Sequence, residues 1–338
     1  MWICIFGARS VLGESVGASS SDFVHVIATR LGIGIYDEAW FDYRLSLFES
    51  ITVPSMMAQT SRDFTLLLGV DKAMPPMARR RLDEIASRAD NVALTEVELK
   101  SDFKRAVTTW STKRAAEAGA ECVLTSRLDD DDALHAGALE RLHGEIADCM
   151  SDGNRFGVFS FNMGTMWIPS ERRGYTRYHD SIGIGLSILE PVGECKTVYA
   201  HPHRNIKQRV TPRGAYVRSI EGRNPWWLYS AHSISDSDTG NRERHDRIIN
   251  HKYGYHVDDD MLASFGLDVG MINELGLISE PRTKAPTKFL SLRAVDLEKK
   301  IKRLREESRG SRPNTLTRWR IARLQRKRRA AGSGIVQP

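Results

Sequence analysis

Four short apolar runs, rich in β-branched and aromatic residues, alternate with helix-like segments in the first half of this 338-residue chain. The strand-like runs are Phe23–Thr29, Phe64–Val70, Asn91–Val97 and Glu121–Thr125. The helix-like segments are Asp37–Ala58 with a bend at Pro54, Pro76 to about Arg88, and Phe103–Ala118 closed by Gly119. This alternation predicts an α/β fold whose sheet is doubly wound, mostly parallel and flanked by helices.

The fourth run leads into four consecutive carboxylates, Asp129 to Asp132. Adjacent carboxylates repel one another, so a fold that gathers them needs a counter-charge, commonly Mg²⁺ or Mn²⁺ bound through oxygen. Ala133–Ile146 has the apolar spacing of a helix, which places the acidic run at the strand end, where open α/β sheets bind ligands. The alternatives are a solvated surface turn and a cap whose negative charge interacts favourably with the positive end of the next helix dipole.

The second half of the chain reads as mixed strands and loops. Strands are expected at Phe156–Phe161, Met163–Ile168, Lys196–Ala200 and Tyr216–Ile220. Arg172–Asp180 is polar and aromatic, as a loop at a binding cleft would be. Pro225–Tyr229 is an aromatic cluster ahead of His232, and Asp258–Leu262 opens a helical piece.

The formal net charge of +6 is unevenly distributed. Residues 299–329 hold fourteen Lys and Arg against two Glu, a net charge of +12, so the rest of the chain carries −6. This tail is helix-prone and broken near Gly310–Pro313. It suits an anionic membrane surface and, as the less favoured partner, nucleic acid; a solvated or disordered end is the alternative. We divide the chain into a flexible leader (1–21), two halves of one domain (22–150 and 151–280), and a linker with the basic tail (281–338).

Location is constrained by what the sequence does not contain. No run of about eighteen apolar residues predicts a transmembrane helix. The first residues lack the basic start of a signal peptide, and the four cysteines show no CxxC pairing. These features predict a cytoplasmic protein with reduced thiols, held by its tail near the inner membrane surface.

Several of these motifs together resemble the putative rhamnosyltransferase family of bacteria, which is similar to the nucleotide-sugar glycosyltransferases of GT-A fold. The matching positions are Thr29–Arg30, Pro54–Ser55, Gln59–Thr60, Arg127–Asp132, Trp227–Leu228 and His232. The likeness covers roughly residues 23–278. It implies a GT-A-like sheet, a nucleotide-sugar donor over its C-terminal edge, and transfer of a sugar such as rhamnose to a glycan or lipid-linked acceptor.

The resemblance also implies roles for individual residues. Asp131, Asp132 and His232 would bind Mn²⁺ or Mg²⁺, which stabilises the charge that a diphosphate leaving group accumulates. The residues expected to contact the donor are Thr29, Arg30, Asp71, Arg127 and Asp129. Among them, Asp71 and Arg30 would meet the base or ribose, and Arg127 the diphosphate or a neighbouring carboxylate. His232 could instead be a buried histidine satisfied by hydrogen bonds.

The catalytic base is the least constrained role. An inverting transferase needs a carboxylate within hydrogen-bond reach of the acceptor hydroxyl, and Glu221 and Asp180 are the candidates. Glu221 is slightly preferred because it adjoins the aromatic cluster, and aromatic rings often stack on sugars. A retaining mechanism stays open.

Three other functions compete with sugar transfer. A prenyl-diphosphate enzyme fits badly, because Ala133 occupies the last position of the required DDxxD spacing. A sugar nucleotidyltransferase would have a longer glycine-rich loop than Arg30–Gly34. The third is a non-catalytic nucleotide- or glycan-binding module whose basic tail binds anionic membrane or nucleic acid; metal-dependent turnover of a nucleotide sugar would exclude it.

Overall fold

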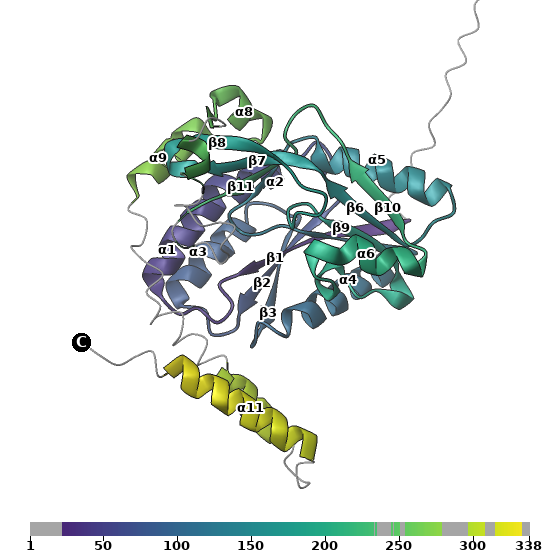
Figure 1. The fold of residues 1–338 in the computed structure, drawn as a ribbon, viewed down its shortest axis with the longest axis vertical. Coiled ribbons are helices and arrows are strands. Elements are labelled where there is room, and N and C mark those ends of the chain that lie inside the picture. Colours follow the sequence, from purple (N-terminus) through teal and green to yellow (C-terminus); the bar gives the residue numbers. More distant parts are fainter. Residues whose placement is uncertain are drawn as a thin grey trace, which may run out of the picture.

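Two β-sheets form the centre of the molecule, and helices lie over them (Figure 1). The structure is a computed structural model that describes residues 22–232, 234, 245, 247–250, 254–278, 297–307 and 315–332. A seven-stranded sheet has the order β10-β6-β9-β4-β1-β2-β3, and a five-stranded sheet has the order β12-β8-β7-β11-β5. The expected α/β class, with a mostly parallel main sheet and a mixed second half, is confirmed.

The four apolar runs of the first half form one side of the seven-stranded sheet. They run parallel to one another, as β–α–β connections require. β9 is antiparallel to both β4 and β6, so β6 and its parallel neighbour β10 point the same way as β4. The strands of this sheet are β1 (Phe23–Leu31), β2 (Thr65–Asp71), β3 (Val92–Val97), β4 (Cys122–Arg127), β6 (Gly157–Phe161), β9 (Ser187–Pro191) and β10 (Tyr216–Ile220).

The helices that cover the sheets follow the predicted segments closely. The segment predicted at Asp37–Ala58 contains α1, a π-helical turn at Phe48–Thr52, and α2, with Pro54 tolerated in the first turn of α2. Gly119 caps α4 in the left-handed conformation, as expected. The helices are α1 (Glu38–Leu47), α2 (Val53–Met57), α3 (Pro76–Ala86), α4 (Phe103–Ala118), α5 (Ala138–Ser151), α6 (Ile206–Val210), α8 (Asp259–Ser264), α9 (Val269–Leu277) and α11 (Thr315–Gly332).

The five-stranded sheet is built from the second half of the chain together with β5 from the first half. Its strands are β5 (Ala133–Leu134), β7 (Met163–Ile168), β8 (Arg173–Tyr178), β11 (Trp227–Ser230) and β12 (Tyr255–His256). β11 pairs with β7 in parallel and with β5 in antiparallel orientation. Because β5 directly follows the acidic run, this pairing fixes the run against β11.

Three local predictions were wrong. The helix expected over Ala133–Ile146 begins only at Ala138, because Ala133 and Leu134 pair with β11. The loop expected at Arg172–Asp180 contains β8, whose backbone bonds are completed by β7 and β12. The strand expected at Lys196–Ala200 is a 3₁₀ turn at Val198–Ala200.

The basic tail contains two helical pieces among the described residues, one at 297–306 and α11. α11 lies outside the two sheets (Figure 1) and exposes Leu316 and Trp319. No helix of the described residues is long and apolar enough to cross a membrane. The predicted leader (1–21) and residues 281–296, at the start of the predicted linker, lie outside the described residues.

Packing between β7 and β11 leaves no room for a side chain at Gly164. A Cβ there would lie 2.0 Å from the Trp227 ring, so Gly164→Ala is expected to lower the free energy of unfolding by about 1–3 kcal/mol through overpacking. Urea unfolding measures this loss. Gly144→Ala is the matched control, since a Cβ on this exposed face of α5 meets nothing within 4 Å. It should stabilise by roughly 0.5–1 kcal/mol, and equal effects of the two variants would contradict the packing.

Candidate functional site

The predicted site residues gather where parallel strands end. The register places Ala28 beside Arg127 and Leu31 beside Val70, so the ends of β4, β1 and β2 lie at one edge of the sheet. The acidic run follows β4 at this edge. Asp130, Asp131 and Asp132 are buried, with 4%, 7% and 1% of their surface exposed. The run is therefore a buried charged cluster rather than a solvated turn.

Arg44 on α1 is the counter-charge inside this cluster. Its Nε and Nη2 donate to the two carboxylate oxygens of Asp130 over 2.8 and 2.6 Å. Its Nη1 lies 3.0 Å from Oδ2 of Asp131. A buried bidentate pair of this kind must stay intact, because a single partner left behind would be an uncompensated buried charge. Asp130 thus anchors α1 to the acidic run.

Asp131 shares its Oδ2 between two cationic or donor groups. His232 Nε2 lies 2.7 Å from this oxygen and 3.0 Å from Arg44 Nη1. With its proton on Nε2, His232 donates to Asp131 and so orients the carboxylate. Metal binding by His232 stays a prediction.

Asp132 is held by the strand that precedes His232. Its Oδ1 accepts from the backbone N–H of Ser230 over 3.0 Å, and its carbonyl oxygen accepts from Thr52 Oγ1 over 3.0 Å. The Ser230 hydroxyl in turn accepts from Trp167 Nε1. β11 therefore fixes the carboxylate of Asp132 and delivers His232 two residues later.

Asp131 and Asp132 differ in the direction in which the protein shifts their pKa values. Burial, followed by the charges of Asp131 and Asp129, raises the pKa of Asp132 well above its ordinary value. Burial also disfavours ionised Asp131, but Arg44 and His232 outweigh it and hold the pKa of Asp131 below its usual range. Asp131 is thus the carboxylate of this pair that these contacts keep charged.

Cations face the acidic run from β1 and β4. The guanidinium carbons of Arg127 and Arg30 lie 4.9 and 5.9 Å from the ring centre of Tyr199, whose hydroxyl donates to the carbonyl oxygen of Ala28. Burial raises the pKa of Tyr199 to about 12, so this ring stays neutral. Among the described residues, the buried Nε atoms of both arginines have no hydrogen-bond partner. They are available for an anion.

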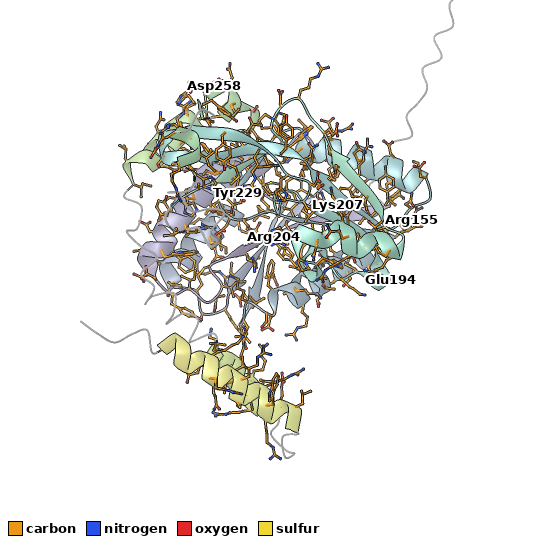
Figure 2. All side chains as sticks on the ribbon, in the orientation of Figure 1. Arg155, Glu194, Arg204, Lys207, Tyr229 and Asp258 are labelled. Carbon is orange, nitrogen blue, oxygen red and sulfur yellow. The ribbon has the colours of Figure 1, made fainter. Side chains whose placement is uncertain are left out.

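Further basic groups come from the segment before and within α6. Burial lowers the pKa of His203, and the neighbouring charges of Arg127 and Arg204 lower it further, while Asp129 opposes them. His179 also acts on His203, which places these groups around the same space. Figure 2 labels Arg204 and Lys207 on this segment. The half-buried carboxylate of Asp129 therefore faces a largely cationic wall.

Of two further residues predicted to contact the donor, the side chain of Asp71 is engaged by other described residues and that of Thr29 is not. Asp71 Oδ2 accepts from the Gly34 N–H over 2.9 Å and from the Tyr36 hydroxyl over 3.1 Å, and Oδ1 accepts from the Ala73 N–H over 2.8 Å. Asp71 thus secures the loop after β1. The hydroxyl of Thr29 is buried and, within the described part of the chain, has no partner. Donor contact by either residue stays a prediction.

The two candidate bases lie at different distances along this edge. Asp180 is exposed, and its carbonyl oxygen accepts from Ser160 on β6; its charge acts on His179 and Lys207. Glu221 is also exposed, but it follows β10, the edge strand beyond β6. Asp180 therefore lies with the basic groups near Asp129.

The aromatic cluster that favoured Glu221 is partly core. Trp227 is completely buried, and its Nε1 donates to the carbonyl oxygen of Phe161. Trp226 is half-buried and packs its ring against Phe161 and His135. Since the face of Trp227 is enclosed, it cannot stack on a sugar, whereas Trp226 is half-buried and lies beside Gly222. The role of Glu221 stays a prediction.

The residues fit a divalent cation that shares its coordination with a ligand. Asp130 is fully engaged by Arg44, and the described residues contain no group of three or more His, Cys, Asp or Glu set to hold a metal. The side chain of Asp129 has no hydrogen bond to another described residue, and Asp131 keeps Oδ1 outside its side-chain contacts. Mg²⁺-type sites commonly use one or two carboxylates with phosphates and water, which matches this donor set.

Sequence reasoning missed Arg44, although a signal for it was present. Arg44 lies three and four residues from Phe41, Trp40 and Phe48 on the apolar side of the predicted helix. A charged residue on a core-facing stripe requires a buried partner. The acidic run is the obvious partner once the helix is placed against it.

Comparison with known proteins adds a family. Residues 10–238, more than half of the chain, match a family model described as "Putative rhamnosyl transferase". A search of curated proteins finds no match. Among solved structures, the chain is similar to S. aureus TarS at 12% identity, covering 82% of this chain and 49% of TarS with a TM-score of 0.35.

Two further structures share this level of similarity. TarS 1–349 in complex with UDP is 11% identical, over 82% of this chain and 80% of that one, with a TM-score of 0.35. A putative nucleotide-diphospho-sugar transferase from Desulfovibrio desulfuricans is 8% identical, over 74% and 97%, with a TM-score of 0.33. The chain spans about half the length of the longer TarS structure.

Removing Arg44 tests the buried charge cluster. Arg44→Met is expected to lower the free energy of unfolding by about 3–5 kcal/mol, because Asp130 is left buried without its counter-charge. Urea unfolding measures this loss. Arg79→Met is the matched control: it breaks surface pairs with Asp83 and Glu96 and should cost under about 1 kcal/mol. A loss for Arg44→Met no larger than for Arg79→Met would contradict this role.

Proposed function

Because the chain belongs to the putative rhamnosyl transferase family, which classes it as a glycosyltransferase, we propose that it moves a sugar from a nucleotide-sugar donor to a glycan or lipid-linked acceptor. One observation of the site carries this proposal. Asp129 lies near two arginines whose Nε atoms lack partners among the described residues, and Asp131, two residues further on, is held charged by Arg44 and His232. At one edge of the sheet, the carboxylates would bind a metal ion and the arginines would bind a diphosphate. This combination suits a metal-bound diphosphate.

The donor would lie along the C-terminal edge of the seven-stranded sheet. Arg127 and Arg30 would contact the diphosphate oxygens, since both are half-buried residues at this edge whose Nε atoms lack partners among the described residues. Asp129 would meet the ribose or the cation. The nucleoside would extend toward the ends of β1 and β2, where Asp71 shapes the loop at Gly34–Tyr36.

Mn²⁺ or Mg²⁺ would be held by Asp131 and Asp129 together with the donor phosphates. When bound, the cation stabilises the negative charge that develops on the leaving diphosphate. Arg44 and His232 keep Asp131 ionised and fixed in orientation. Asp132 accepts a hydrogen bond from the N–H of Ser230 and so fixes the turn that carries Asp131.

Asp180 is the proposed catalytic base of an inverting transfer. Its carboxylate is exposed to solvent, where an acceptor hydroxyl could approach it, and it adjoins the basic groups that face Asp129. It would accept the proton of the attacking hydroxyl as the bond to the sugar forms. Glu221, farther along the sheet, is the second candidate.

A lipid-linked acceptor would place the enzyme at a membrane surface. α11 presents exposed Leu316 and Trp319 on a helix that carries seven Lys and Arg and no acidic residue. Apolar and aromatic side chains that insert among lipid headgroups, with basic residues beside them, characterise interfacial helices. We therefore place the protein in the cytoplasm, at the inner membrane surface through α11.

Asp131→Asn tests the proposed reaction. It keeps the shape of the side chain but removes its charge, so turnover of the donor should fall at least about 100-fold, while the melting temperature stays within a few degrees. Release of nucleoside diphosphate from a panel of nucleotide sugars with Mn²⁺ measures turnover. Asp152→Asn, at the C-terminal end of α5, is the control and should keep wild-type turnover. Equal turnover by the two variants would refute the metal assignment.

Leu316→Ser combined with Trp319→Ser tests the membrane contact. Co-sedimentation with vesicles containing anionic phosphatidylglycerol should fall several-fold, because the apolar part of the contact is lost, and wild-type binding should weaken as salt rises. Leu277→Ser on α9 removes another exposed leucine and should leave binding unchanged. Unchanged sedimentation of the double variant would contradict the role of α11.

A further inference from the structure

The helix at 297–306 is part of the body of the protein, although it belongs to the basic tail. Leu297 and Ile301, one turn apart, are 6% and 3% exposed. Both lie well beyond residue 238, where the family match ends. This helix therefore lies outside the matched region.

Ion pairs fix the helix against the ends of β2 and β3. Arg303 Nη1 donates to both carboxylate oxygens of Asp102 over 2.6 and 2.7 Å, and Nη2 donates to Glu98 Oε2 over 3.0 Å. Lys299 donates to the Tyr36 hydroxyl, and its Nζ lies 3.6 Å from Asp71 Oδ1. Lys299 thus reaches the same loop that Asp71 holds.

A cavity of about 390 Å³ lies between this helix and the strand ends. Its lining is of mixed charge: the body contributes Asp71, Lys72, Ala73, Glu98 and Leu99, and the helix contributes Lys299, Lys302, Arg303 and Glu306. Asp71 already accepts from three groups, and Arg303 is engaged by Asp102 and Glu98. Glu98 is paired with Arg303, and Glu306 lies 4.0 Å from Lys302 Nζ, so the carboxylates of the wall have cationic neighbours, while Lys299 has three N–H donors to distribute.

The cavity lies at the same edge of the sheet as the acidic run. β4, β1, β2 and β3 are consecutive and parallel, so their C-terminal ends point the same way. Two strand spacings, roughly 10 Å, separate the end of β4 from the end of β2. A nucleoside diphosphate whose phosphates lie at Asp129 and Arg127 would direct its base toward this cavity.

We propose that the helix at 297–306 closes the nucleobase end of the donor site, and that Lys299 determines which base is accepted. This inference rests on the proposed function. Lys299 has three N–H donors, of which one goes to Tyr36 and one faces Asp71. The third can bind a ring carbonyl oxygen. Uracil, thymine and guanine carry such an oxygen, whereas adenine does not.

Binding of nucleoside diphosphates to the full-length protein tests the assignment. Isothermal titration with UDP, dTDP, GDP and ADP, each with Mn²⁺, is expected to show tighter binding of at least one carbonyl-bearing base than of ADP. Lys299→Met should weaken that binding roughly tenfold or more, because a hydrogen bond from a charged donor is lost. The same substitution should leave the affinity for ADP unchanged and so remove the preference for the carbonyl-bearing base.

Two variants serve as controls. Lys299→Arg keeps a cationic donor and should retain the preference for the carbonyl-bearing base. Arg305→Met removes a charge from an exposed position of the same helix that does not line the cavity, and it should bind as the wild type does. Melting temperatures of all variants separate a lost contact from a lost fold.

The outcomes separate this inference from the function on which it rests. If the wild type binds none of the four nucleotides, the proposed function fails and the inference fails with it. If the wild type binds and Lys299→Met keeps both affinity and preference, the inference alone is overturned. Tighter binding by Lys299→Met would show that the helix competes with the nucleotide, and this also overturns it.

Discussion

The ion pair between Arg44 and the acidic run is the interaction on which the site depends. Three of the four consecutive carboxylates are buried, which requires a counter-charge, and the bidentate contact of Arg44 with Asp130 provides one from within the chain. The same guanidinium reaches Asp131 and contacts His232. α1, the end of β4 and the end of β11 are thereby joined at one point. Asp131 is consequently held charged and oriented before any ligand arrives, as a preorganised electrostatic site requires.

Burial divides the acidic run by task. Asp130 is engaged by Arg44, and Oδ1 of Asp132 accepts from the N–H of Ser230, so both carboxylates hold the run in place. Metal binding by Asp132 stays a prediction. Asp129 faces the cations of β1, β4 and the α6 segment, and Oδ1 of Asp131 lies outside the contacts with Arg44 and His232. A run of identical residues therefore contains two carboxylates that hold the run in place and two that suit a metal-bound diphosphate. The basic tail also has two parts with different environments. Its first helix, at 297–306, packs against the body, whereas α11 exposes Leu316 and Trp319.

The alternation of strands and helices, the cap at Gly119 and the position of the acidic run could be predicted because each depends on local pattern. The β5 pairing could not, because Ala133 and Leu134 acquire their partner only when β11 folds beside them. The positions of Arg44 and of the helix at 297–306 depend on tertiary contacts as well, but each has a recognisable pattern in the sequence. Arg44 interrupts an apolar stripe, and Leu297 and Ile301 recur at helical spacing within a charged segment. The roles of Asp180, Asp131 and His232 toward ligands remain predictions.

The central claim is that this sheet edge binds a nucleotide sugar together with a divalent cation. Thermal unfolding with UDP-, GDP- and dTDP-sugars, each with and without Mn²⁺, tests it most directly, because a ligand that binds only the native state raises the melting temperature. The site described here predicts a rise with at least one donor that requires both the nucleotide sugar and the metal. No rise with any donor in the presence of Mn²⁺ would contradict it.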